Sequence, residues 1–321
     1  MCYWKTWISK VREIALRYGI IKYPNSIMKT DITYIQGIEV EDAVEIARHC
    51  FFRDEEVQFR EYIVRSMEDF QKIYQEMLKY RDYEGYLAEV YAAAGREAAK
   101  YYGICEVCNA PQTFVVDYQS ANVENGLRVP NWRERLVCPN CGCNNRQRFM
   151  AHTVFENYRI GMEVLIYEQT SLLYQRIKRE IPGIVGFEYR GEGYQSGAVY
   201  GGVNCQDICG LSFGDESFDL IISNDVFEHA DNYYGAFSEA YRVLRPGGKL
   251  IFTVSFNANS KRIEQRFEGN DKKKSHIFGW DMLDILKDCG FSEAYGKVYY
   301  GMKEGYMGYL PIYFEALKRE K

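Results

Sequence analysis

Residues 211–254 contain two apolar runs separated by a polar cluster and a helical segment. The runs are 218–223 and 249–254, and both have the length of buried strands. Between them, apolar residues recur at three- and four-residue spacing, and a Pro-Gly-Gly turn leads into the second run. This order predicts strand, polar loop, helix, turn and strand. Open α/β sheets bind their ligands at the carboxyl ends of the strands, where the polar cluster falls. Its residues are Asn224, Asp225, Glu228 and His229.

The net charge and the distribution of apolar residues indicate which kinds of binding partner and which cellular location to expect. The chain has 321 residues, enough for two domains, and a net charge of -5. It therefore lacks the overall positive field that nucleic-acid binders use. No apolar stretch approaches the roughly 20 residues that span a bilayer. Residues 1–19 have the pattern of an amphipathic helix and lack the features of a signal peptide. We therefore expect a cytoplasmic protein that does not bind membranes.

Four of the ten cysteines form two C-x-x-C pairs, which are separated by 29 residues. Each pair can occupy a tight turn that directs both thiolates toward one ion, and two such turns complete a tetrahedral site suited to zinc. A site with four cysteine ligands has no open position, so the predicted zinc is structural. Redox use of a C-x-x-C pair is the alternative, and Cys143 is an alternative fourth ligand. The predicted ligands are Cys105, Cys108, Cys138 and Cys141.

Four arginines lie near the second cysteine pair, interleaved with Trp132 and Phe149. They indicate either a local contact with nucleic acid or another anion, or a charged face that packs the cysteine module on its neighbours. We favour the packing role. The arginines are Arg133, Arg135, Arg146 and Arg148.

The central block resembles the class I S-adenosylmethionine-dependent methyltransferases, specifically the methyltransferase type 11 group. The resemblance rests on Asp215 to Asp219, on the Glu228-His229 pair and on the sequence R-V-L-R-P-G-G that ends at Gly248. Residues 131–138 and 145–148 are similar to an N-terminal zinc ribbon with four cysteines that precedes the catalytic domain in bacterial relatives.

The resemblance implies an α/β fold with a doubly wound, Rossmann-like, seven-stranded methyltransferase sheet and an antiparallel last strand. We expect a helical N-terminal region (1–102), a small zinc-ribbon module (103–150) and the methyltransferase domain (151–321). Strands are expected at 161–167, 183–189, 199–205, 219–223, 249–254, 294–300 and 309–317. Helices are expected at 39–52, 54–80, 83–102, 171–179 and 280–289.

The implied cofactor is S-adenosylmethionine. The loop after the first strand keeps the family's acidic residue, Glu168, but continues with Gln169, Thr170 and Ser171 in place of glycines, a form similar to a family variant. Glu188, at the end of the second strand, is expected to accept hydrogen bonds from the ribose hydroxyls. The remaining residues expected to contact the cofactor are Tyr189, Asp207 and Ile208 at the adenine and Asn224 and Asp225 beside the sulfonium.

Methyl transfer from a sulfonium depends mainly on alignment and on exclusion of water, and a base helps when the acceptor is a hydroxyl. His229 is the first candidate base because an imidazole titrates near neutral pH. Glu228 is expected to orient His229 or to face the substrate. His276, in a segment similar to one that borders the acceptor cleft in the family, is the second candidate.

Three functions remain open on the sequence alone. We favour a methyltransferase that acts on a small-molecule or glycan-type acceptor. An RNA methyltransferase that recognises RNA through its zinc module is the second, although a nucleic-acid partner is not favoured. A non-catalytic binding protein with a degenerate cofactor site is the third, because the first loop lacks its glycines. The acceptor and the oligomeric state are not predicted.

Overall fold

The computed structural model describes Val44, Arg48 and residues 51–52, 54–93, 98–124, 126–191, 193–268 and 273–320. The amphipathic helix expected at residues 1–19 and most of the one expected at 39–52 lie outside these ranges. The chain divides into two compact units, each built from three segments. The first unit comprises residues 1–60, 75–149 and 299–311, and the second comprises 61–74, 150–298 and 312–321. The expected domain boundaries remain a prediction.

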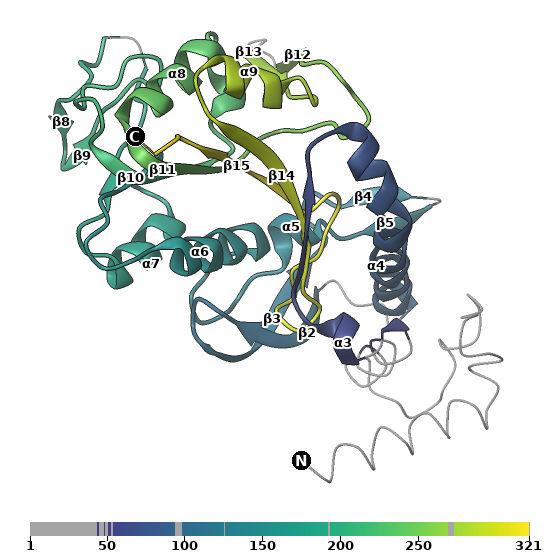
Figure 1. Ribbon diagram of the computed structural model, residues 1–321. Helices are drawn as coiled ribbons and strands as arrows, with labels where there is room; N and C mark the ends of the chain where they lie inside the picture. The colour runs from purple at the N-terminus through teal and green to yellow at the C-terminus, as the bar shows by residue number, and fades with distance from the viewer. Residues whose placement is uncertain are drawn as a thin grey trace, which may run out of the picture. The chain divides into compact units, whose positions relative to one another are not determined.

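The second unit is organised around a mixed sheet of seven strands (Figure 1). Four neighbouring strands are parallel, and the last strand of the chain runs antiparallel to its neighbours, as the resemblance implied. In spatial order the strands are β1 (Arg60–Val64), β14 (Glu293–Tyr300), β15 (Ile312–Leu317), β11 (Leu244–Thr253), β10 (Phe218–Asn224), β6 (Val164–Ile166) and β7 (Val185–Gly186).

Helices cover both faces of this sheet (Figure 1). One face carries α6 (Asn145–Asn157) and α7 (Leu172–Glu180), and the other carries α8 (Tyr233–Val243) and α9 (Met282–Asp288). Each helix buries the apolar stripe that its sequence period predicts, for example Ala236, Phe237 and Ala240 of α8. The central strands β6 and β10 are buried on both faces, as parallel strands between helices must be. The doubly wound α/β prediction is confirmed.

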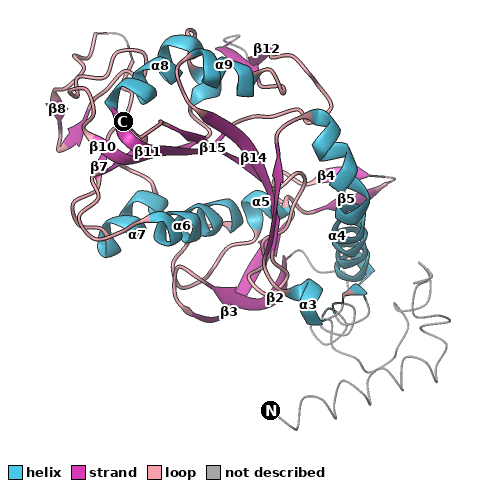
Figure 2. Cartoon of the chain, viewed as in Figure 1, coloured by secondary structure: helices cyan, strands magenta, loops and turns pink. Residues whose placement is uncertain are grey.

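Several expected strands differ from the observed ones in extent. β11 begins at Leu244 because the Pro-Gly-Gly segment also pairs: the Gly247 amide donates to the Lys318 carbonyl. Residues 199–205, expected as one strand, form a hairpin of β8 (Val199–Tyr200) and β9 (Val203–Asn204). Figure 2 draws this small hairpin beside the label β8. Gly201 and Gly202 both have positive φ, the geometry of a tight two-residue turn. A single parallel bridge, Glu188 with Cys205, extends the large sheet beyond β7.

The described part of 1–102 is less helical than expected. It contains α3 (Asp54–Val57) and the long α4 (Met67–Ala93), but β1 interrupts the helix expected at 54–80. The end of the helix expected at 83–102 is strand instead, because residues 98–102 begin β2 (Ala98–Cys105), which pairs with β3 (Ala110–Asp117). Along β1 and β2, exposed and buried residues alternate, which is the period-two signal of a strand in a sheet.

The cysteine module contributes short elements to the first unit. β2 and β3 form a hairpin, and a second hairpin joins β4 (Asn122–Glu124) to β5 (Leu127–Val129). The short helix α5 (Trp132–Arg135) follows. In the second unit, η2 (Phe227–His229) is a single helical turn after β10, and β12 (Glu264–Glu268) pairs with β13 (Lys273–Ile277). Among the described residues, no helix combines the length and apolar character that crossing a membrane requires.

Candidate functional site

The four predicted metal ligands converge in the first unit. Their sulfur atoms all lie within 4.8 Å of one another. Cys105 Sγ lies 3.8 Å from Cys141 Sγ, and Cys108 Sγ lies 3.8 Å from Cys138 Sγ. Four sulfurs at about 2.3 Å from one zinc ion lie about 3.8 Å apart at the corners of a tetrahedron. Two of the sulfur–sulfur distances match this spacing, so the cluster could hold a metal ion.

Backbone geometry explains why each C-x-x-C pair folds into a tight turn. The first pair lies at the tip of the β2–β3 hairpin, where Asn109 has a φ of 49°. The second pair ends at Gly142, which has a φ of 75° and whose amide donates to the Cys138 carbonyl. Glycine and asparagine tolerate this left-handed conformation. Cys143 does not belong to the cluster.

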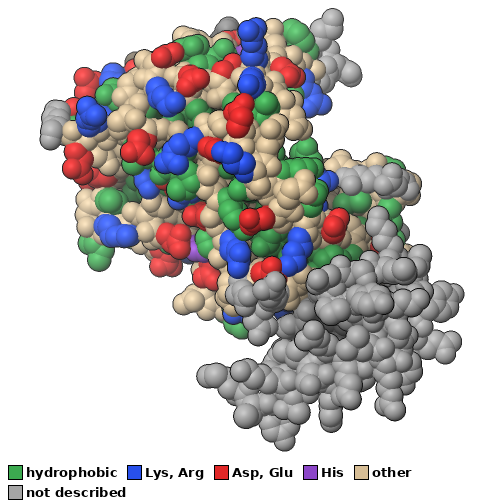
Figure 3. Space-filling model, turned by 45° about the vertical axis from the view of Figure 1, so that its right-hand side comes forward, with side chains coloured by type: hydrophobic (Ala, Val, Ile, Leu, Met, Phe, Trp, Pro, Cys, Tyr) green, Lys and Arg blue, Asp and Glu red, His purple; other side chains and the backbone are tan. Residues whose placement is uncertain are grey.

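Each of the four arginines near this cluster donates to an acidic side chain or a backbone carbonyl of the protein. Arg135 makes two hydrogen bonds to Asp117, at 2.8 and 2.6 Å. Arg148 is fully buried and donates to the carbonyl of Glu304 at 2.6 Å. On the face drawn in Figure 3, positive and negative side chains of the described residues alternate.

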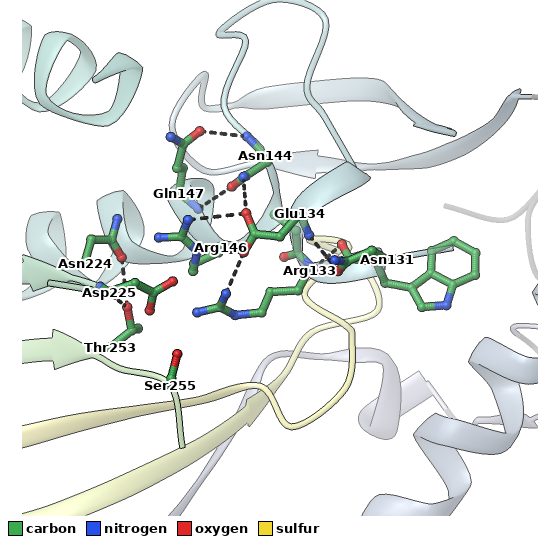
Figure 4. A network of polar contacts seen from close by, with 12 residues as sticks. Asn131, Arg133, Glu134, Asn144, Arg146, Gln147, Asn224, Asp225, Thr253 and Ser255 are labelled. Atoms are coloured by element: carbon green, nitrogen blue, oxygen red, sulfur yellow. Dashed lines mark hydrogen bonds and ion pairs between the residues drawn. The ribbon is translucent and has the colours of Figure 1, made fainter. Parts of the chain in front are cut away.

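The other two arginines share one carboxylate (Figure 4). Glu134 accepts hydrogen bonds from Arg133 at 2.6 Å and from Arg146 at 2.8 and 3.3 Å. Asn144 donates to the same carboxylate at 2.7 Å. This network fixes α5 against the start of α6 within the cysteine module itself, so packing of the module on its neighbours stays a prediction for these two arginines.

In the second unit, the loop after β6 is held by Glu188. One oxygen of this carboxylate, Oε1, accepts hydrogen bonds from the amides of Gln169 and Thr170, both at 2.8 Å, and from the Thr170 hydroxyl at 2.7 Å. Glu188 therefore stands at the predicted end of the second strand, and it anchors the loop with one oxygen. Ser171 caps α7, since its hydroxyl accepts from the Tyr174 amide at 3.0 Å.

The first loop packs closely on a glycine of the neighbouring strand. None of residues 168–171 has a positive φ, so this loop does not need glycine for its backbone conformation. Gly186 in β7 supplies the close contact instead. A Cβ at this position would lie 2.6 Å from the Tyr174 ring and 2.7 Å from the Glu168 carbonyl oxygen. This packing leaves room only for glycine at position 186.

Gln169 links the same loop to the β8–β9 hairpin. Its side-chain amide donates to the Gly202 carbonyl at 3.1 Å, and its side-chain oxygen accepts from the Asn204 amide at 2.8 Å. The side chain of Gln169, a predicted cofactor residue, therefore holds the hairpin in place through both its oxygen and its nitrogen.

A second line of polar groups joins the ends of β6, β10 and β11. Asn224 donates to Glu168 at 3.3 Å and accepts from the Thr253 hydroxyl at 3.1 Å. The Asp225 amide donates to the same hydroxyl at 3.2 Å, and Asp225 has a φ of 52° (Figure 4). An aspartate in this conformation turns the chain sharply at the strand end. The sequence placed Asn224 and Asp225 here, but it gave no indication of Thr253.

The residues predicted to meet an adenine follow the Glu188–Cys205 bridge. Asp207 is exposed and accepts from the Cys209 amide at 2.8 Å, whereas Ile208 is buried. Tyr189 is 60% exposed. Gln206, not predicted, is buried and bonds Ser212 through both ends of its side-chain amide.

Arg242 of α8 shapes the loop that follows. It donates to the carbonyls of Leu211 and Phe213, both at 2.9 Å, and to Glu239 at 2.7 and 2.8 Å. Glu239 in turn accepts from the Leu211 amide at 2.8 Å, and Arg242 holds the pKa of this carboxyl below its usual value. Arg242 lies in the R-V-L-R-P-G-G sequence, but its role depends on contacts that the motif alone does not reveal.

Among the candidate bases, Glu228 has the most distinctive surroundings. It is buried in η2, and its Oε1 accepts from the amide and hydroxyl of Ser255, at 3.0 and 3.2 Å. Its Oε2 is buried and has no hydrogen-bond partner among the residues that the structure describes. Burial raises the pKa of Glu228 to about 7, and the charge of Asp225 adds to the rise. The sequence did not indicate Ser255, which follows β11 at the same edge of the sheet.

The two histidines lie in different surroundings. His229 is exposed at the end of η2. His276 is buried in β13, with Nδ1 3.3 Å from the backbone oxygen of Glu228 and its ring edge-on to Tyr233 at 4.9 Å. The structure therefore brings Glu228 and His276 together, and both histidines remain candidates.

Comparison with known proteins agrees with this arrangement. The sequence model of a family described as "Methyltransferase domain" matches residues 189–252. An uncharacterized protein of Methanocaldococcus jannaschii is 32% identical over 85 residues, which are 25% of this chain and 42% of that protein. A malonyl-[acyl-carrier protein] O-methyltransferase of Methylococcus capsulatus is 36% identical over 78 residues, 24% of this chain and 28% of that protein. The chain thus spans less than half the length of these curated relatives.

A solved structure of an S-adenosylmethionine-dependent methyltransferase from Thermotoga maritima is 19% identical, with a TM-score of 0.37. The match covers 55% of this chain and 91% of that chain, and a TM-score this low supports no conclusion. The family match includes the whole of β10 and α8 and most of β11. Residues 189–252 of this chain are thus similar to the methyltransferase domain family.

Proposed function

We propose that this protein transfers a methyl group from S-adenosylmethionine to a small-molecule or glycan-type acceptor. The observation that carries the proposal is the convergence of polar side chains at the carboxyl edge of β6, β7 and β10, partly within the segment that matches the methyltransferase family. Open α/β sheets bind ligands at this edge.

The residues at this edge fit the chemistry of the cofactor. Its ribose needs hydrogen-bond acceptors, and Glu188 has Oε2 in addition to the oxygen that holds the loop. Its adenine carries an amine that the exposed carboxylate of Asp207 can accept. The cofactor also carries two positive charges, at the sulfonium and the α-amino group, which the acids at the strand ends complement. These acids are Glu168 and Asp225.

The bound cofactor would supply an already activated methyl group. The protein then has to orient the acceptor and exclude water, and the fixed loops provide this preorganisation. Glu188 and Gln169 hold the first loop, while Arg242 holds the loop after Asp207. These contacts fix the site before any ligand binds.

We also propose that Cys105, Cys108, Cys138 and Cys141 bind one structural zinc ion. The convergence of their sulfur atoms within 4.8 Å, with two separations of 3.8 Å, supports this role. Four thiolates leave no position for an activated water molecule, so this ion takes no part in the reaction.

The choice of acceptor rests on charge. Arg135 is neutralised by Asp117, and Arg133 and Arg146 share Glu134, so these side chains do not form a positive track for RNA. A curated relative, the O-methyltransferase of Methylococcus capsulatus, has a carrier-bound malonyl acceptor by name. Salt-dependent RNA binding by the native protein would favour the RNA alternative instead.

The cofactor assignment is tested by calorimetry with S-adenosylmethionine and S-adenosylhomocysteine. Glu188→Ala removes a ribose acceptor and releases three donors of the first loop, so we expect its dissociation constants to rise by at least about tenfold, equivalent to about 1.4 kcal/mol. Glu180→Ala, at the exposed end of α7, is the matched control and should bind as the native protein does. Equal affinities in the two variants would refute the ribose assignment. Absence of binding heat in the native protein would favour the non-catalytic alternative.

A further inference from the structure

Glu228 has a buried carboxyl group in which one oxygen accepts hydrogen bonds and the other accepts none from the described residues. Only 3% of the residue is exposed. Oε1 is held by both donors of Ser255, whereas Oε2 is shielded from solvent and lacks a partner. Leaving a buried polar atom unpaired costs free energy, so such an atom calls for an explanation. A ligand that donates a hydrogen bond to Oε2 would remove this cost.

The position of Glu228 suits a role in the reaction. Its turn, η2, begins two residues after Asp225 at the carboxyl end of β10, and Ser255 lies two residues beyond the same end of β11. The two strands are neighbours in the sheet, so Glu228 lies beside the edge at which the cofactor is proposed to bind. Ser255 is exposed, so this part of the edge is open to solvent.

We propose that Glu228 receives the proton that the acceptor loses when it is methylated. This inference rests on the proposed function and goes beyond it by naming the base and the class of acceptor, an O–H or N–H nucleophile. A lone pair of the acceptor forms the bond to the methyl carbon, the sulfur keeps the electron pair of the broken C–S bond, and the proton passes to Oε2. The protonated carboxyl group then releases this proton to solvent.

The groups around Glu228 favour a carboxyl group that changes its protonation near neutral pH. Asp225 is the nearest acid, and its charge opposes ionisation of Glu228. The other titratable groups are His229 in η2, His276 in β13 and Tyr233 in α8. Lys273 and Lys274 also belong to β13, but the side chains of these two lysines lie outside the described part of the structure. No salt bridge to Glu228 occurs among the described residues, and burial remains the largest influence on its pKa.

Proton release on ligand binding tests the inference without knowledge of the acceptor. S-adenosylmethionine carries a sulfonium, whereas S-adenosylhomocysteine has a neutral sulfur in its place. A positive charge beside Glu228 favours its ionised form. We therefore expect binding of S-adenosylmethionine at pH 7 to release up to about half a proton per site, and binding of S-adenosylhomocysteine to release less. Calorimetry in buffers with different ionisation enthalpies measures the number of protons that are released per ligand bound.

Two variants and one control complete the experiment. Glu228→Gln should abolish the difference between the two ligands, and the exposed Glu293→Gln should preserve it. Ser255→Ala removes one donor to Glu228 while its backbone donor remains, so it should move the midpoint of proton release to higher pH. If Glu228→Gln does not fold, this shift decides the question.

The outcomes separate the inference from the proposed function. Both ligands binding with equal proton release, or a difference that persists in Glu228→Gln, would overturn the role of Glu228 alone. An unchanged midpoint in Ser255→Ala would count against it in the same way. If neither ligand binds the native protein, the proposed function fails and the inference fails with it.

Discussion

Replacing Arg148 by methionine should be among the most damaging changes in the cysteine module. Its guanidinium lies 3.8 Å from the centre of the Phe114 ring and donates to the carbonyls of Glu304 and Gly305 at 2.6 and 3.4 Å. These carbonyls belong to the segment that joins β14 to β15, so Arg148 fastens this segment to the module. Arg148 is 0% exposed, and the replacement leaves the carbonyls without this donor.

The expected loss follows from these contacts. One strong hydrogen bond from a charged donor contributes about 1.5–3 kcal/mol, and a desolvated cation–π contact contributes about 2 kcal/mol. The variant also avoids the cost of burying a guanidinium, which offsets part of the sum. We expect a net loss of about 3 kcal/mol of unfolding free energy, which is a large share of the stability of a typical domain.

Urea denaturation followed by circular dichroism measures this loss. Arg135→Met is the matched control, because Arg135 lies in the same module and its ion pair with Asp117 is about one-third exposed. Exposed pairs of this kind contribute about 0.2–1 kcal/mol. The urea midpoint of Arg148→Met should therefore fall by about 1 M or more, and that of Arg135→Met by much less. Equal losses in the two variants, or a neutral Arg148→Met, would refute the reasoning.

Three further predictions concern the metal, the first loop and pH. Cys138→Ser should lose one zinc ion per chain in metal analysis and unfold at a lower temperature, whereas Cys143→Ser should retain the ion; equal zinc contents would exclude the proposed ligand set. Gly186→Ala should weaken S-adenosylhomocysteine binding by about tenfold or more, because the added methyl group meets the Glu168 carbonyl, whereas Gly183→Ala has open space and should bind normally. The raised pKa of Glu228 means that the folded state binds more protons than the unfolded state between about pH 4.5 and pH 7. This group should therefore subtract up to about 3 kcal/mol of stability as pH rises through that window, and Glu228→Gln should remove that contribution from the measured slope.

Features set by local sequence could be predicted before the structure was known. The two C-x-x-C pairs fold into turns because Asn109 and Gly142 supply the left-handed residues that each turn needs. β10, α8 and the end of α9 at Gly290 follow from apolar period and glycine position in the same way. These signals lie within a few residues of the structures that they specify.

Features that depend on distant contacts could not be predicted. The close packing of Gly186 on the first loop depends on the pairing of β7 with β6, which the sequence alone does not reveal. Ser255 reaches Glu228 because β10 and β11 are neighbours, although 27 positions separate the two residues in the chain. The short strand β1 was mistaken for helix because tertiary pairing with β14, and not local propensity, determines its conformation.

A crystal structure of the protein with S-adenosylhomocysteine tests the central claim most directly. The account predicts the nucleoside at the carboxyl edge of β6 and β7, with a ribose hydroxyl within hydrogen-bond distance of Glu188 Oε2 and the adenine amine at Asp207. The sulfur should lie beside Asn224. A ligand bound away from this edge, or side chains of residues 168–172 filling the place of the nucleoside, would contradict the account.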